Sequence, residues 1–145
     1  MSVQYYCGET DKAKYIYFKK DCLLQPIGQF HDSVEMIFML DGKAEAHLYD
    51  KTYIMQRGDI FFVDSYEGHW YKHLTSEILA FVLVLSREYL EDFYELYADQ
   101  TFMTYMSDKK KNQRIFDLIE RWYGETEKTH IKNLGYANLL FSYII

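Results

Sequence analysis

The side chains of this 145-residue sequence best suited to chemistry are imidazoles and a carboxylate grouped at two places. His31 stands four residues before Glu35, and the segment His69-Trp70-Tyr71-Lys72-His73 alternates chemically active residues with others. Because successive side chains of a strand point to opposite faces, His69, Tyr71 and His73 share one face, and His31 and Glu35 have a common parity. Such a set can hydrogen-bond a polar ligand or hold a divalent metal ion.

The elements that must position these residues are short strands. Up to Leu85 the sequence consists of brief extended runs separated by turn residues, which is typical of an antiparallel sandwich or barrel. Asp41-Gly42 predicts a hairpin, and Gly42 and Gly58 are expected to serve turn geometry. Pro26 suggests an edge strand or a bulge. The predicted strands are 15–18, 23–30, 34–40, 44–49, 52–55, 60–63, 69–74 and 78–85.

After Leu85 the apolar period changes to that of helices. We predict a helix over 87–97 with Ser86 as its N-cap, a second between Asp108 and Gly124, and a third beginning near Thr129. The sequence therefore predicts a barrel over 1–85 and a helical segment over 86–145 packed on it as one structural domain. The third helix is apolar almost all round and has no C-cap, which indicates a chain cut from a longer protein or a buried end.

Composition narrows the function classes. The net charge of −6 argues against a nucleic-acid surface, since Lys109-Lys110-Lys111 is the only basic run. No apolar run is long enough for a membrane span and the N-terminus lacks a signal peptide, so a cytoplasmic protein with reduced Cys7 and Cys22 is expected. Aromatic residues make up 19% of the sequence, which favours strands and supplies rings for a ligand pocket.

The spacing of the candidate residues resembles the two motifs of the cupin fold. The first motif, G-x5-H-x-H-x3-E-x6-G, is matched in part by Gln29-x-His31-x3-Glu35-x6-Gly42, where Gln29 replaces the first histidine. The second, G-x5-P-x-G-x2-H-x3-N, is matched in part by Gly58-x5-Asp64-x-Tyr66-x2-His69-x3-His73. The resemblance implies a double-stranded β-helix, or jelly-roll barrel, in which these side chains point into one barrel mouth.

Gly58 to His69 also resembles the corresponding stretch of AraC-type transcription regulators, whose cupin sensor domain is followed by helices that pair two subunits. The resemblance implies a ligand-sensing and dimerisation domain that binds a small polar metabolite such as a sugar, with DNA bound only by a helix-turn-helix domain absent from this chain. The ligand residues would be Gln29, His31, Glu35, His69, Tyr71 and His73. The residues of the homodimer interface would be Ile115, Leu118, Ile119, Trp122, Leu134 and Phe141.

Two alternatives stay open. In metal cupins the His and Glu cluster holds a divalent ion, and His31, Glu35 and His69 would form a two-His-one-carboxylate set suited to Fe or Mn. That set would make the protein a stand-alone enzyme such as a dioxygenase or isomerase. A dimeric cupin without a small ligand is the other alternative. We expect a protein that is not an enzyme and has no cofactor, and we expect Trp70 to pack under the helices.

Overall fold

The computed structural model describes residues 4–5, 15–97 and 102–145 and contains two five-stranded sheets. One sheet, here the helix-covered sheet, has the order β10-β7-β4-β9-β2, and the other, the solvent-facing sheet, has the order β1-β3-β8-β5-β6. All pairings are antiparallel except β1 with β3. The strands are β1 Gln4–Tyr5, β2 Ile16–Asp21, β3 Gln29–Phe30, β4 Val34–Asp41, β5 Lys43–Leu48, β6 Lys51–Gln56, β7 Ile60–Val63, β8 His69–His73, β9 Leu79–Leu85 and β10 Tyr105–Met106.

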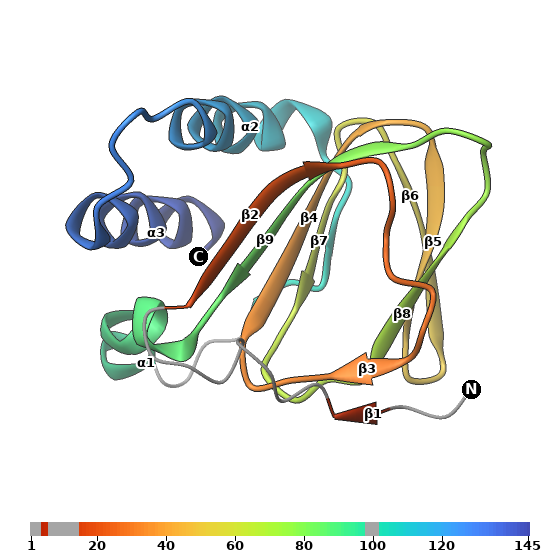
Figure 1. Cartoon of the computed structure of the whole chain (residues 1–145), viewed down its shortest axis with the longest axis horizontal. Helices are drawn as coiled ribbons and strands as arrows, with labels where there is room; N and C mark the ends of the chain where they lie inside the picture. The colour runs from red at the N-terminus through yellow and green to blue at the C-terminus, as the bar shows by residue number, and fades with distance from the viewer. Residues whose placement is uncertain (1–3, 6–14, 98–101) are drawn as a thin grey trace.

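The molecule has three layers (Figure 1). The two sheets face each other, and helices α2 (Lys109–Tyr123) and α3 (His130–Ile144) lie against the outer side of the helix-covered sheet. The predicted barrel followed by helices is confirmed.

Alternating residues of the helix-covered sheet serve two separate cores. In β4, Met36 and Phe38 pack toward the helices, whereas Ile37 and Met39 lie between the sheets. A sheet buried on both faces needs apolar residues at every position, which is why β4, β7 and β9 are nearly continuous apolar runs.

The expected hairpin at Asp41-Gly42 is wrong. β4 and β5 belong to different sheets, so the chain crosses there from the helix-covered sheet to the solvent-facing one. Gly42 has a φ of 79°, and a Cβ at this position would lie 2.4 Å from the Glu77 carbonyl oxygen. Gly58, with a φ of 89°, occupies the crossing from β6 to β7. Turn geometry therefore explains both glycines, as predicted, but in corners between sheets.

The strand predicted over 23–30 is reduced to Gln29–Phe30. Pro26 has no backbone N–H and cannot donate to a ladder. The N–H of Leu24 donates instead to a side chain, Nε2 of His73, at 3.1 Å. Before this irregular segment, β2 continues past Phe18 to Asp21, and Cys22 then carries a free, exposed thiol. Cys7 lies outside the described residues.

The helical segment differs from the prediction at its beginning. Arg87–Leu90 forms a 3-10 helix before α1 (Glu91–Leu96), and the Ser86 hydroxyl makes no capping hydrogen bond. β10 interrupts the segment and pairs with β7, so the barrel uses residues from beyond 85. The side chains of Asp108 and Thr129 cap α2 and α3 as predicted. Within the described ranges, no helix is both long and apolar enough to cross a membrane.

The residues expected to pair two subunits are used inside the chain. Five of the six are at most 4% exposed in the core between the helices and the sheet: Ile115, Leu118, Ile119, Trp122 and Phe141. Leu134 is half-buried against the same core. Helical periodicity identifies an apolar face but not what covers it, and here the covering surface is the chain's own sheet. The assignment of these buried residues to a dimer interface is corrected accordingly.

Trp70 is also placed differently from the expectation. It lies on the outer face of the solvent-facing sheet, on the opposite side of the barrel from the helices. Its ring stacks on that of His47 at 3.6 Å between centroids. The parity of Trp70 is opposite to that of His69 and Tyr71, as the sequence indicates, but the sheet that carries it has no helix on its outer side.

Candidate functional site

A cavity of about 360 Å³ opens between the two sheets. Four of the six predicted ligand residues line it, namely Gln29, His31, Glu35 and Tyr71. They come from β3, the β3–β4 connection, β4 and β8, so both sheets contribute polar groups to one wall. The remaining lining residues are Tyr15, Tyr17, Asp21, Leu23, Leu24, Gln25, Ile37, Val82 and Val84.

Glu35 lies at the centre of the polar wall. The odd residues of β4 point between the sheets, which places this carboxylate among apolar neighbours with only 6% of the residue exposed. Its Oε2 accepts a hydrogen bond of 2.5 Å from the Tyr71 hydroxyl and lies 3.0 Å from Nε2 of His69. Oε1 accepts no hydrogen bond from the described residues. One carboxylate oxygen therefore holds the site together while the other is available to a ligand.

Both buried histidines have one ring nitrogen fixed by the backbone. Nδ1 of His31 donates to the Ser33 carbonyl at 2.9 Å, and Nδ1 of His69 donates to the Glu67 carbonyl at 2.8 Å. Their Nε2 atoms are thereby left for other partners. Nε2 of His69 lies within ion-pair distance of Glu35 Oε2, and it has no hydrogen bond in the described structure.

Burial and the neighbouring charges determine the protonation of this group. Burial is the largest single effect and favours a neutral Glu35, but the charge and close approach of His69, the charge of His31 and the Tyr71 hydroxyl together outweigh it. They lower the pKa of Glu35 to about 2. Burial likewise favours a neutral His69, yet the carboxylate of Glu35 raises the pKa of His69 above its ordinary 6.5. Burial lowers the pKa of His31, and burial followed by the charge of Glu35 raises that of Tyr71. Glu35 and His69 therefore favour each other's charged form, whereas burial favours the neutral form of His31.

The arrangement of His31, Glu35 and His69 also fits a divalent metal ion. One ligand atom from each of the three lies within 4.8 Å of the others. The hydrogen bonds from both Nδ1 atoms to backbone carbonyls are the usual supports of metal-binding histidines, and the Nε2 of His69 is a buried nitrogen without a hydrogen bond. A metal ion at Nε2 of His69 would compete with a proton, because a histidine ligand must be unprotonated at its coordinating nitrogen.

His73 is not part of the cavity wall. It shares the inward face of β8 with His69 and Tyr71, as the alternation predicts, but its Nε2 accepts the hydrogen bond from the Leu24 N–H. His73 therefore supports the irregular segment that forms the rim of the cavity. His69 lies behind the wall, where it contacts Glu35.

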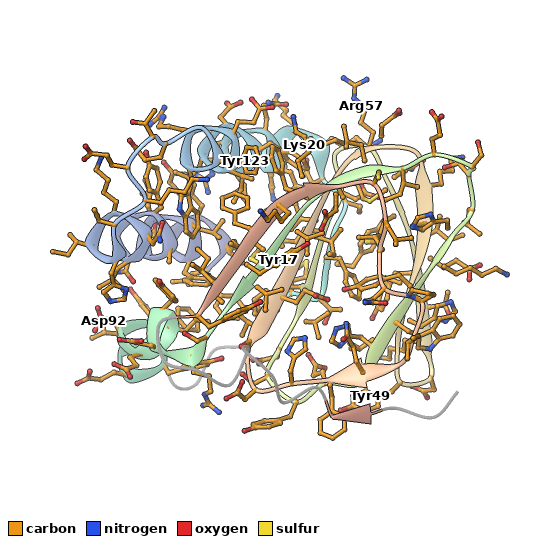
Figure 2. The ribbon with its side chains drawn as sticks, viewed as in Figure 1. Tyr17, Lys20, Tyr49, Arg57, Asp92 and Tyr123 are labelled. Atoms are coloured by element: carbon orange, nitrogen blue, oxygen red, sulfur yellow. The ribbon has the colours of Figure 1, made fainter. Side chains whose placement is uncertain are left out.

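The part of the cavity wall formed by β2 and the residue before it was not predicted from the sequence. Tyr15, Tyr17 and Asp21 line the cavity, and the Tyr17 hydroxyl donates to Asp21 Oδ2 at 2.6 Å. Figure 2 shows Tyr17 on β2, with Lys20 nearer to α2, where Tyr123 lies. The three residues are an even number of positions apart and so share one face of the strand, which was the available signal. No cupin motif falls on this strand.

Residues 25–85 match the cupin domain family, and the two facing sheets described above have the cupin fold. Among solved structures, the chain is similar to the AraC-like transcriptional activator CuxR, with 12% identity and a TM-score of 0.57 over 79% of this chain and 41% of CuxR. It is also similar to apo ToxT K231A from Vibrio cholerae, with 12% identity and a TM-score of 0.56 over 92% of this chain and 56% of ToxT. No curated protein sequence matches.

A third similar structure is the S161A mutant of oxalate decarboxylase from Bacillus subtilis, with 17% identity and a TM-score of 0.41 over 51% of this chain and 22% of that one. At these identities the likeness concerns the fold alone. The chain spans about a fifth to just over half of these three proteins.

Proposed function

We propose that this cupin domain is the ligand-sensing part of an AraC-type regulator and binds a small polar metabolite, of which a sugar is one example, between its two sheets. The observation that carries the proposal is the cavity of about 360 Å³, whose wall contains Gln29, His31, Glu35 and Tyr71. Ligand sites are typically concave, largely apolar and furnished with a few convergent polar groups. The likeness to CuxR supports the regulator class, because it extends over both the barrel and the helices.

Binding would act by shifting a conformational equilibrium, which requires different affinity for two states. The helices pack on the helix-covered sheet, whose other face lines the cavity through Ile37, Val82 and Val84. A ligand that changes the spacing of the sheets would therefore change the surface under α2 and α3. DNA would be bound by a separate domain.

The ligand test is a thermal-shift screen of the purified chain against polar metabolites, followed by calorimetry. We expect saturable binding that His31→Ala weakens at least tenfold. His47→Ala is the matched control, because that histidine lies on the outer face against Trp70. Binding unaffected by both His31→Ala and Gln29→Ala would contradict the cavity as the site.

The assignment to the AraC-type regulators can be tested separately, from the gene sequence. A helix-turn-helix pattern encoded after the Ile145 codon supports it, and a stop codon there contradicts it.

A second candidate function, a metal-dependent cupin enzyme, is favoured by the geometry of His31, Glu35 and His69. A bound divalent ion would supply Lewis acidity, the three residues would hold it, and Tyr71 would orient the carboxylate through its hydrogen bond. Elemental analysis of protein purified without chelators tests this. One equivalent of Fe, Mn, Ni or Zn that is lost in His69→Ala supports the enzyme, and a metal content near zero after growth in supplemented medium contradicts it.

The homodimer stays a prediction, now with different residues. The exposed apolar side chains of α3 include Ile131 at 80% and Leu139 at 39%, one turn on either side of Gly135. Pairing of two chains through this helix would use these residues in place of the buried ones.

A further inference from the structure

Three polar atoms of the cavity wall that have no hydrogen-bond partner among the described residues are acceptors, whereas the side-chain amides of Gln25 and Gln29 can both donate and accept. His31 donates from Nδ1 to the Ser33 carbonyl, and in the tautomer that this hydrogen bond selects its Nε2 is a lone pair. Glu35 presents Oε1, and Asp21 presents Oδ1, since the hydroxyls of Tyr71 and Tyr17 bind the other oxygen of each carboxylate. None of these three atoms is bonded to another described residue. A ligand that satisfies these three atoms must therefore supply hydrogen-bond donors.

The charge of the wall has one sign. Among the described residues, the cavity lining includes two carboxylates, Asp21 and Glu35, and no lysine or arginine. Glu35 is compensated by His69, whereas Asp21 forms no ion pair in the described part of the chain. Lys19 lies between Tyr17 and Asp21 on the same face of β2, but its side chain is exposed and does not line the cavity. Among the described lining residues, an anionic ligand would meet the negative charge of Asp21 and no lysine or arginine.

The two carboxylates stand at different levels of the barrel. Tyr17 and Glu35 both pair with Val84 of β9, whereas Asp21 pairs with Ala80, four residues away. Four residues of strand correspond to roughly 13 Å. The space between the two levels is lined by tyrosine rings and by the apolar Ile37 and Val82. The cavity therefore has acidic groups at two levels and an apolar, aromatic middle.

Tyrosine rings attract cations through their negative faces. Tyr15, Tyr17 and Tyr71 all line the cavity. The tyrosine rings, the hydrogen-bond acceptors and the carboxylates of the cavity therefore all favour a cationic ligand.

We propose that the cavity is selective for a small organic amine, which places an ammonium group at Asp21, an aliphatic body against the tyrosines and apolar residues, and further N–H or O–H donors at His31 and Glu35. This inference rests on the proposed function, in that it names the ligand class of the same cavity. It distinguishes amines from neutral sugars and from carboxylates.

The test compares three five-carbon probes that differ only in their end groups: 1,5-diaminopentane, 1,5-pentanediol and glutarate. Calorimetry on the full chain should give the order diamine, then diol, then glutarate. Asp21→Asn should weaken the diamine about tenfold, the equivalent of about 1.4 kcal/mol, and leave the diol unchanged. Asp41→Asn, which changes an exposed aspartate outside the cavity, is the matched control and should have no effect.

A second variant guards against misfolding. Tyr17→Phe keeps the ring but removes the hydroxyl that orients Asp21, so it should weaken the diamine more than the diol. Glutarate or the diol binding as tightly as the diamine would overturn the amine assignment. So would undetectable diamine binding, or a resident divalent ion that the diamine fails to displace.

Failure of the amine assignment can be told apart from failure of the proposed function. Diol or glutarate binding that is lost in His31→Ala leaves the ligand-sensing cavity intact and removes only the cationic ligand class. Absence of binding by these probes and by the whole metabolite collection removes both.

Discussion

The Tyr71 hydroxyl and the Glu35 carboxylate form a buried 2.5 Å hydrogen bond between residues 36 positions apart, one from each sheet. This contact links the solvent-facing sheet to the helix-covered sheet at the base of the cavity. It also orients the carboxylate, whose same oxygen, Oε2, lies 3.0 Å from Nε2 of His69.

Removing this link should cost stability. Tyr71→Phe leaves the ring in place but deprives Glu35 of a donor, and loss of a buried hydrogen bond to a charged group typically costs about 1–3 kcal/mol. Urea unfolding should show that decrease in the free energy of unfolding. Tyr49→Phe is the control, since the Tyr49 ring is 68% exposed, and it should change the value by less than about 0.5 kcal/mol. Equal effects of the two changes would contradict the role of the link.

The ion pair of Glu35 and His69 predicts a stability maximum in mildly acidic solution. The pKa of Glu35 is lowered from 4.5 to about 2, so its contribution is present above pH 4.5 and is lost as the pH falls toward 2. The pKa of His69 is raised, so its contribution is complete below 6.5 and is lost as the pH rises through the folded-state value. The pair therefore stabilises most between about pH 4.5 and 6.5.

The size of the acid limb follows from linkage. At about 1.4 kcal/mol per unit, the Glu35 shift corresponds to about 3 kcal/mol. Unfolding of chelator-treated protein over a pH series, compared with Glu35→Gln, measures it. The difference between the two proteins should shrink on both sides of the window, and a difference independent of pH would show that the pair contributes nothing.

Two glycines offer a matched comparison. Gly42→Ala places a Cβ against the Glu77 carbonyl in a left-handed conformation and should destabilise by more than about 2 kcal/mol. At Gly135, in the exposed middle of α3, a Cβ meets no atom within 4 Å, so Gly135→Ala should stabilise by about 0.5–1 kcal/mol. Thermal unfolding of the two variants measures both changes in stability. A stabilising Gly42→Ala would refute the corner geometry.

Substitutions on the buried and the exposed faces of the helices should affect folding and dimerisation separately. Trp122 is fully buried and donates from Nε1 to Asn133 Oδ1 at 2.9 Å, so Trp122→Ala should cost about 3–5 kcal/mol. Ile131→Lys, at a site 80% exposed, should leave folding unchanged and lower any dimer fraction seen by analytical ultracentrifugation. A dimer that survives Ile131→Lys combined with Leu139→Lys would exclude the exposed face of α3 as its interface.

The sequence by itself determined the local elements and the inward residues. Period-two alternation predicted which residues of β5 and β8 point inward, the change of period after Leu85 located the helices, and the cupin spacing identified His31, Glu35 and His69 as a group. These properties depend on neighbours within a few residues, so they can be recognised in the sequence.

Only the tertiary structure decided which surfaces meet. Sheet partners are distant in sequence, so nothing local shows that Asp41-Gly42 crosses between sheets, that His73 accepts the Leu24 N–H, or that β2 brings Asp21 to the cavity. An apolar helix face has the same pattern whether a sheet or a second chain covers it. Trp122 is therefore buried by its own barrel for a reason that periodicity cannot express: the helix-covered sheet is apolar on both faces and needs α2 and α3 to remove one of them from water.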